Sequence, residues 1–477
     1  MIDPSPPTCT YRWSSGAKEA DVQSGVLAEL AEAVRVGKVD PVDLVDESLR
    51  RIEASHETLN AVTAVRADEA RADAEASPRT GALAGLPLLV KDMARCAGMR
   101  TKFGSPLYAD AEPDTIDDVV VARLKAAGAI VLGRSNTPAF GHTAVTTNDV
   151  YGTTRNPWNP DRSPAGSSGG SAAALIAGLV PLATSSDGGG SVRIPASCCG
   201  LVGYKPTMGA IGRNVVPRWI SLSTQGATGR TVADVVLEAS VTLGPARGDI
   251  LSLPAGGVQP EPRRPARVLA CRSFRADVDP VIEAAFDEAL GDLAGDGYPV
   301  QRVTPPFDAS VAASWYTIAS ADLAQSMTEH RHHWDDFEPS LRYLLEAGER
   351  ITLFDYIAAQ RRRFDVAAEL DDLLGTDGVL VVPTNNSVSW PADGPMPTSA
   401  GAIENDLSIA INTVDLNFTG HPAVSVPLGY DEYGVPFGLQ IVAPRFNDGI
   451  ALGLAAAMER VRPWPTVAPG YEPYPVP

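Results

Sequence analysis

The stretch SSDGGGSVRIPA, residues 185–196, places three consecutive glycines directly before Ser191. Ordering glycine is costly in backbone entropy, so a run of three indicates a need for backbone without side chains. Backbone N–H groups crowded around one hydroxyl are typical of an anion cradle with a nucleophile at its edge. The residues Gly188, Gly189, Gly190 and Ser191 therefore suggest nucleophilic catalysis with an oxyanion held by amides.

A serine nucleophile needs a base, yet the sequence has no histidine between His142 and His330. Lys91 is a candidate because it ends the apolar run GLPLLV and should lie at the carboxyl end of a buried strand. Burial can lower a lysine pKa by up to about 3–5 units from ~10.4, and a neutral lysine is a competent general base. The alternative interpretation is a structural salt bridge from Lys91 to Asp92 or Asp187.

Three other serine or glycine patterns are weaker. GSSGG at 166–170 matches the G-x-S-x-G elbow with Ser168 as nucleophile, but a proline-rich loop precedes it where a strand is needed. SGAK at 15–18 matches S-x-x-K, and we interpret it as chance. Neither phosphate-binding glycine pattern stands between a strand and a helix, so nucleotide binding has little support.

One histidine cluster has the spacing of metal ligands. In HRHHWDD, residues 330–336, His330 and His333 are one helical turn apart and could share a metal with Asp335 or Asp336. The segment lies in polar, amphipathic, helix-like sequence, so a solvated helix face is the simpler interpretation.

The elements that must position these residues alternate between helices and short apolar strands, which predicts an α/β fold. A helix stops at Gly37, and a second starts with Asp40 as its cap and Pro41 at its first position. The clearest later elements are strands at 85–91, 129–136, 266–273 and 378–384, helices at 116–128, 169–183, 279–294 and 448–460, and helical sequence from about 310 to 374. The glycine- and proline-rich stretch 252–266 is interpreted as an insertion rather than a domain boundary.

Net charge, apolar runs and cysteine content indicate which partners and compartments to expect. The formal charge of −19, from 58 acidic against 39 basic residues, repels phosphate backbones and argues against nucleic acid. We find no apolar run of about 18 residues and no signal peptide, so neither a membrane span nor secretion is expected. Five cysteines form an odd, sparse set in which Cys198 and Cys199 are adjacent. Packed thiols in a cytoplasmic protein are the expectation.

Lys91 after its apolar strand, SPAGSSGGSAAALIAGLVPLA and SSDGGGSVRIPA together resemble the amidase signature family. GRSNTPAF, YGTTRNPWNP, ASCCGLVGYKPT and PAVSVPLGYDEYGVPFGLQIVA also look like that family. The resemblance covers about residues 22–464. It implies one α/β/α domain with a central mixed β-sheet and helices on both faces, a catalytic core at about 80–240 and a variable substrate entrance at about 300–400. Residues 1–21 and 465–477 would be an extension and a tail.

The resemblance also implies a Ser–cis-Ser–Lys triad. Ser191 would be the nucleophile, Ser167 the bridging serine after a cis peptide bond, and Lys91 the final base. The N–H groups of residues 188–191 would form the oxyanion hole. Ser168, Asp187 and Arg193 would support the site without reacting. No cofactor and no metal are implied.

Relatives of this kind hydrolyse aliphatic and aryl amides, and some cleave carbamates, so the resemblance implies a small-molecule amide or carbamate substrate. We expect a monomer or a homodimer. Two alternatives stay open: the glutaminase component of a tRNA-dependent amidotransferase, and a binding protein without catalysis. Gly188, where relatives often carry threonine, is expected to leave room for bulky acyl groups. Seven aromatic residues of the variable half are candidates for an entrance funnel or for helix packing: Trp315, Tyr316, Trp334, Phe337, Tyr343, Phe354 and Tyr356.

Overall fold

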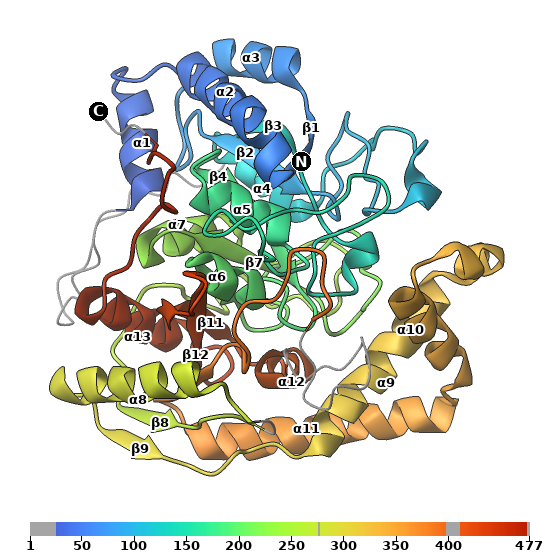
Figure 1. The fold of residues 1–477 in the computed structure, drawn as a ribbon, viewed down its shortest axis with the longest axis vertical. Coiled ribbons are helices and arrows are strands. Elements are labelled where there is room, and N and C mark those ends of the chain that lie inside the picture. Colours follow the sequence, from blue (N-terminus) through green and yellow to red (C-terminus); the bar gives the residue numbers. More distant parts are fainter. Residues whose placement is uncertain (1–24, 275–276, 397–410, 475–477) are drawn as a thin grey trace, which may run out of the picture.

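A computed structural model describes residues 25–274, 277–396 and 411–474 (Figure 1). The S-x-x-K pattern at 15–18 lies outside these ranges. The two expected N-terminal helices are present as α1 (Val26–Arg35) and α2 (Pro41–Leu59). The Asp40 side chain accepts the N–H of Val42 at 3.0 Å, so Asp40 caps α2 as predicted.

The first of two sheets carries the candidate base. Its strand order is β1-β3-β2-β4, with β2 parallel to both of its neighbours and β1 antiparallel to β3. Lys91 is the last residue of β2, and all five residues of that strand are buried. The bounds are β1 (Val62–Val65), β2 (Pro87–Lys91), β3 (Ile130–Ser135) and β4 (Leu182–Ala183), with helices α3 (Ala67–Glu75), α4 (Val119–Ala126) and α5 (Gly169–Ile176) between them.

The second sheet has eight strands in the order β5-β7-β6-β11-β12-β10-β8-β9, and mixes antiparallel pairs with the parallel pairs β8–β10 and β8–β9. A mixed sheet was expected, but hydrogen bonding divides it in two, with the chain passing between them from β4 to β5. The bounds are β5 (Ser185–Asp187), β6 (Val202–Lys205), β7 (Thr224–Gly229), β8 (Arg267–Ala270), β9 (Val300–Arg302), β10 (Gly378–Pro383), β11 (Ala423–Tyr430) and β12 (Pro436–Val442).

Helices pack on both faces of this second sheet because its side chains alternate. On strand β6, Val202 and Tyr204 point into a core shared with α7 (Val232–Thr242), α8 (Pro280–Gly295) and α13 (Asp448–Val461). Gly203 between them faces α6 (Arg193–Cys199), where a Cβ would lie 2.6 Å from the Ala196 methyl. Helix α6, which directly follows Ser191, therefore packs closely against the sheet.

The variable half forms a group of helices at one end of the molecule, away from α1–α3 (Figure 1). It comprises α9 (Ala309–Ser326), the 3₁₀ segment Thr328–Asp336, α10 (Pro339–Arg350) and α11 (Leu353–Leu374). Two shorter 3₁₀ turns, Pro106–Tyr108 and Ala139–Gly141, and helix α12 (Ile411–Thr419) complete the description.

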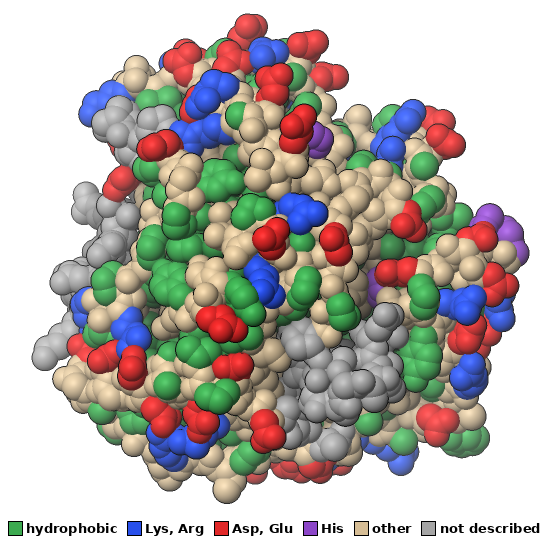
Figure 2. All heavy atoms as spheres, in the orientation of Figure 1, with side chains coloured by type: hydrophobic (Ala, Val, Ile, Leu, Met, Phe, Trp, Pro, Cys, Tyr) green, Lys and Arg blue, Asp and Glu red, His purple; other side chains and the backbone are tan. Residues whose placement is uncertain are grey.

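The cysteines, the helices and the surface charges can be compared with what the composition predicts. The described cysteines, Cys96, Cys198, Cys199 and Cys271, are free and buried, as expected of packed thiols. Within the described ranges, no helix has both the length and the apolar character that crossing a membrane requires. On the face shown in Figure 2, acidic and basic side chains are interspersed.

Candidate active site

The Lys91 amine is surrounded by three hydroxyls. Its Nζ lies 2.8 Å from Ser167 Oγ, 2.9 Å from Ser168 Oγ and 3.2 Å from Ser186 Oγ. The first two serines were singled out in the sequence; Ser186, on β5, was not. The peptide bond between Gly166 and Ser167 is cis, as the family resemblance implies.

Burial sets the charge state of Lys91. The residue is 1 % exposed, and this burial lowers its pKa from 10.5 to about 7, against a smaller opposite effect of Asp187. The alternative of a salt bridge is wrong for both predicted partners. Asp92 accepts the backbone N–H groups of Lys102 and Gly104, and Asp187 pairs with Arg193 at 2.8 Å.

Ser191 and Ser167 line one cavity of about 370 Å³ together with Lys91. Ser191 lies two residues before α6, and its Oγ has no hydrogen-bond partner among the described residues. Its carbonyl accepts the N–H of Ser168 at 3.3 Å, which joins the two serine segments. The structure therefore brings the three predicted catalytic residues to one cavity.

Each carbonyl of the glycine loop accepts a hydrogen bond from the protein. The Asp187 carbonyl accepts Asn417 Nδ2 (2.9 Å), that of Gly188 accepts the Trp315 indole N–H (3.0 Å), and that of Gly189 accepts the Thr413 hydroxyl (2.7 Å). The Gly190 carbonyl accepts the N–H of Ile194 (2.7 Å). In a trans peptide the N–H points opposite to the C=O.

The four N–H groups that follow these carbonyls are not equivalent. The Gly190 N–H donates to Asp187 Oδ1 at 2.7 Å, so it is already engaged. The N–H groups of Gly188, Gly189 and Ser191 find no acceptor among the described residues. Three of the four amides predicted for an oxyanion hole are thus available, and the fourth holds the loop in shape.

The reason for the glycines is steric. A Cβ on Gly188 would lie 2.3 Å from the Trp219 ring, one on Gly189 2.8 Å from the Trp315 ring, and one on Gly190 2.4 Å from Thr413 Oγ1. Gly190 also has a φ of +133°, which disfavours any side chain. The expectation that Gly188 leaves room for bulky acyl groups is wrong, because Trp219 fills the space beside it.

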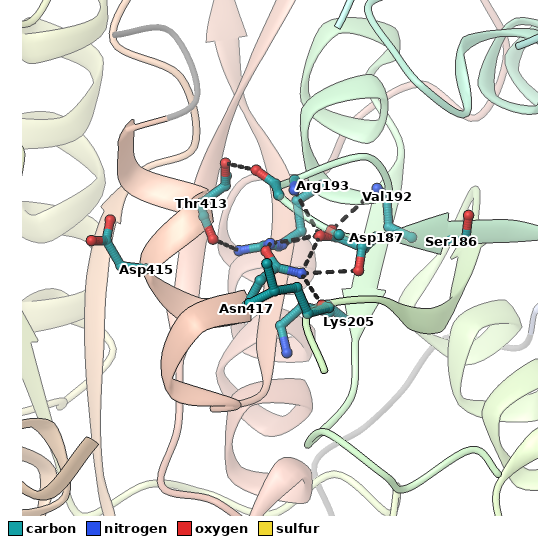
Figure 3. A network of polar contacts seen from close by, with 12 residues as sticks. Ser186, Asp187, Val192, Arg193, Lys205, Thr413, Asp415 and Asn417 are labelled. Atoms are coloured by element: carbon teal, nitrogen blue, oxygen red, sulfur yellow. Dashed lines mark hydrogen bonds and ion pairs between the residues drawn. The ribbon is translucent and has the colours of Figure 1, made fainter. Parts of the chain in front are cut away.

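A buried ion pair holds the glycine loop through a network of polar contacts (Figure 3). Arg193 binds Asp187 through Nε (2.9 Å) and Nη2 (2.8 Å), and both carboxylate oxygens also accept loop N–H groups. Further Arg193 N–H groups reach Gln440 and Asn417. These bonds hold the pKa of Asp187 well below its usual range despite its burial. Asp187 and Arg193 contact the loop without lining the cavity, a placement compatible with supporting residues.

Strand alternation explains the place of Ser186. Adjacent residues of β5 point to opposite faces, so Asp187 reaches Arg193 while Ser186 reaches Lys91, and Ser186 lies apart from the ion-pair network in Figure 3. The alternation around Asp187 was the signal that could have identified Ser186 from sequence.

The aromatic lining of the cavity does not come from the variable half of the chain. It is formed by Phe103, Tyr108, Phe140 and Trp219, and none of the seven aromatic candidates of the variable half lines it. Trp315 and Trp334 are buried packing residues, while Phe354 is 82 % exposed. Phe103 and Phe140 each precede a glycine in a loop and have positive φ angles of 52° and 53°. In the sequence, the only local sign of these two residues is that each stands directly before a glycine.

The histidine cluster does not form a metal site in the described part of the chain. His333 Nδ1 contacts Asp336 at the surface (3.1 Å), and His330 Nε2 contacts the Tyr108 hydroxyl (3.2 Å). No group of three or more histidine, cysteine, aspartate or glutamate side chains suited to a metal occurs among the described residues. No histidine of the described ranges lines the cavity, so Ser168 lacks the histidine that the G-x-S-x-G motif pairs with its serine.

Comparisons with known proteins agree on the family. The sequence profile described as Amidase matches residues 43–452. The chain is 32 % identical to an acylamidase of Rhodococcus erythropolis over 91 % of this chain and 95 % of that protein. It is 33 % identical to a glutamyl-tRNA(Gln) amidotransferase component of Thermus thermophilus over 90 % of this chain and 96 % of that protein.

Solved structures extend the similarity to the fold. A bacterial aryl acylamidase of the amidase signature family superposes with a TM-score of 0.83 at 28 % identity, over 92 % of this chain and 96 % of that one. The 6-aminohexanoate cyclic dimer hydrolase superposes with a TM-score of 0.85 at 29 % identity, over 93 % and 98 %. The predicted fold class is confirmed.

Proposed function

The chain belongs to the amidase signature family, and on that premise we propose that it is an amidohydrolase that cleaves small amides through an acyl-enzyme on Ser191. The observation that carries the proposal is the Lys91 amine, buried, with a pKa of about 7, and 2.8 Å from Ser167 Oγ beside the cavity that Ser191 lines. No other described arrangement offers a base to a serine next to free backbone amides.

The hydroxyls around Lys91 support a direction for proton transfer. A neutral amine has one lone pair and two N–H groups. The N–H groups can donate to Ser168 and Ser186, which leaves the lone pair for the proton of Ser167. Ser168 Oγ donates in turn to the Ser186 carbonyl (3.4 Å), so its own proton is directed away from Lys91.

The reaction follows from these positions. Ser191 Oγ attacks the substrate carbonyl and passes its proton to Ser167, which passes its own to Lys91. The oxyanion accepts hydrogen bonds from the N–H groups of Gly188, Gly189 and Ser191, the three without an acceptor among the described residues. The proton returns through Ser167 to the leaving amine, and a water molecule then hydrolyses the acyl-enzyme by the same route.

The aromatic lining of the cavity favours substrates with an aryl or alkyl group over free glutamine. Four aromatic side chains line the cavity, which suits aryl or alkyl amides. Carbamates present the same carbonyl to a serine and are included in the proposal as a second substrate class. Glutamine is the substrate expected if the chain is instead the glutaminase component of an amidotransferase.

The test is a hydrolysis panel of anilides, primary amides, aryl carbamates and glutamine, with the wild type, Ser191→Ala and Lys91→Ala. We expect anilide turnover by the wild type alone, and labelling by a fluorophosphonate that Ser191→Ala abolishes while circular dichroism is unchanged. Glutamine turnover without anilide turnover would favour the amidotransferase alternative. Full labelling of Ser191→Ala would refute Ser191 as the nucleophile.

A further inference from the structure

Arg218 projects a guanidinium among the aromatic rings of the same cavity. Its Cζ lies 4.3 Å from the Phe103 ring centroid, 4.8 Å from that of Phe140 and 6.0 Å from that of Tyr108. Aromatic faces attract cations, and the attraction grows when water is excluded. The rings therefore fix the position of this charge.

Arg218 has no acidic partner in the described part of the chain. No aspartate or glutamate oxygen lies within 4.0 Å of it, and its buried Nε has no hydrogen-bond partner. Burial lowers the pKa of Arg218, as does the nearby Arg95, whereas the Tyr108 hydroxyl favours the charged form. Asp118 also lines the cavity, but the charged residues that act on it are Arg95, Asp114 and Arg134.

The arginine of the supporting network provides a contrast. Arg193 is fully buried and engages Asp187, Gln440 and Asn417. Arg218 is only partly buried, but its Nε is shielded from water, and a shielded charge without a partner is costly. The missing partner of Arg218 is then expected to arrive with the ligand.

We propose that Arg218 binds a carboxylate of the substrate, so that the enzyme prefers amides that carry a negative charge. This inference rests on the proposed function. The guanidinium lies close to three rings, and no acidic side chain of the described residues engages its N–H groups, the part that binds carboxylates in a bidentate manner. The formal charge of −19 makes the overall field of the protein unfavourable for anions. The Arg218 guanidinium is a local cation that would favour anionic over neutral substrates inside the cavity.

The experiment uses two pairs of substrates that differ only in charge. One pair places the carboxylate on the acyl half: the mono-4-nitroanilide of succinic acid and its methyl ester. The other places it on the amine half: 4-acetamidobenzoate and its methyl ester. The enzymes are the wild type, Arg218→Gln, Arg218→Lys and Arg100→Gln, the last being an exposed arginine outside the cavity lining.

We expect Arg218→Gln to lower kcat/KM for the charged member of at least one pair by about 10- to 100-fold, mainly through KM, because a charge-assisted hydrogen bond is lost. The neutral ester should change by no more than about threefold, Arg218→Lys should restore part of the difference, and Arg100→Gln should behave as the wild type. Equal losses for charged and neutral members of both pairs would overturn the proposal.

A binding measurement separates this inference from the proposed function. In the Ser191→Ala background, calorimetry compares 4-acetamidobenzoate and the succinyl anilide with their esters, with and without Arg218→Gln. Tighter binding of a carboxylate that disappears with Arg218→Gln supports the inference even if the wild type hydrolyses neither pair. Indistinguishable binding of acid and ester overturns it even if anilides are hydrolysed.

Discussion

Protonation of Lys91 should switch hydrolysis off. The proposed base works only as a neutral amine, and burial lowers its pKa from 10.5 to about 7. An unshifted lysine would be neutral in only about 1 molecule in 3,000 at pH 7, whereas this one is neutral in about half, a gain of about 1,500-fold in active base. Below pH 7 the neutral fraction falls tenfold per pH unit, and above pH 8 it is nearly complete.

The assay is kcat/KM for a neutral anilide between pH 5 and 9.5 at constant ionic strength, since this quantity reports groups of the free enzyme. We expect a single rising limb with its midpoint near pH 7. Asp118 is the necessary control, because it lines the same cavity and burial raises the pKa of its carboxyl to about 6. Asp118→Asn should leave the midpoint in place.

Ser186→Ala sharpens the measurement. The Ser186 hydroxyl accepts a hydrogen bond from the Lys91 nitrogen, which favours the charged ammonium. Removing this hydroxyl should therefore move the midpoint of the pH profile to lower pH, while the rising limb remains. A rate that is flat between pH 6 and 8, or a midpoint above pH 9, would refute the argument that burial creates the base. Circular dichroism at each pH checks that the fold persists.

Two further predictions concern the glycine loop. Asp187→Asn leaves the Arg193 charge buried and unpaired, so it should lower the free energy of unfolding by about 3–5 kcal/mol in denaturant titrations. An unchanged denaturation midpoint would show that the Asp187–Arg193 pair contributes little to stability. Trp315→Phe keeps the ring but removes the donor to the Gly188 carbonyl, so kcat should fall by about tenfold with KM little changed. A fall confined to KM would show that Trp315 acts on substrate binding rather than on the oxyanion amides.

Local patterns predicted the parts of the site that depend on local sequence. An apolar run ending in lysine placed Lys91 at the end of a buried strand, and that is where it lies. The glycine run before Ser191 predicted a loop of exposed amides, three of which are free of protein acceptors among the described residues. Both features are encoded within a few consecutive residues, so the sequence alone could reveal them.

Long-range contacts account for what the sequence did not reveal. The cavity rings Phe103 and Phe140 come from loops whose course is set by packing against distant segments. Trp219 meets Gly188 only in the folded chain, which reversed the expectation about room for acyl groups. The Gly190 N–H donates to the Asp187 carboxylate. The position of that carboxylate is fixed by hydrogen bonds from Arg193 and Asn417, which are distant in sequence or unpredictable in geometry.

The donors that anchor the loop carbonyls reach it from far along the chain: Trp315 belongs to α9, and Thr413 and Asn417 belong to α12. During synthesis the lysine and both serines leave the ribosome before any of these anchors exists. Catalytic competence should then arise only after the last quarter of the polypeptide has docked. A truncated chain that lacks α12 would carry the proposed triad without the anchors of its loop carbonyls, so we expect it to be inert.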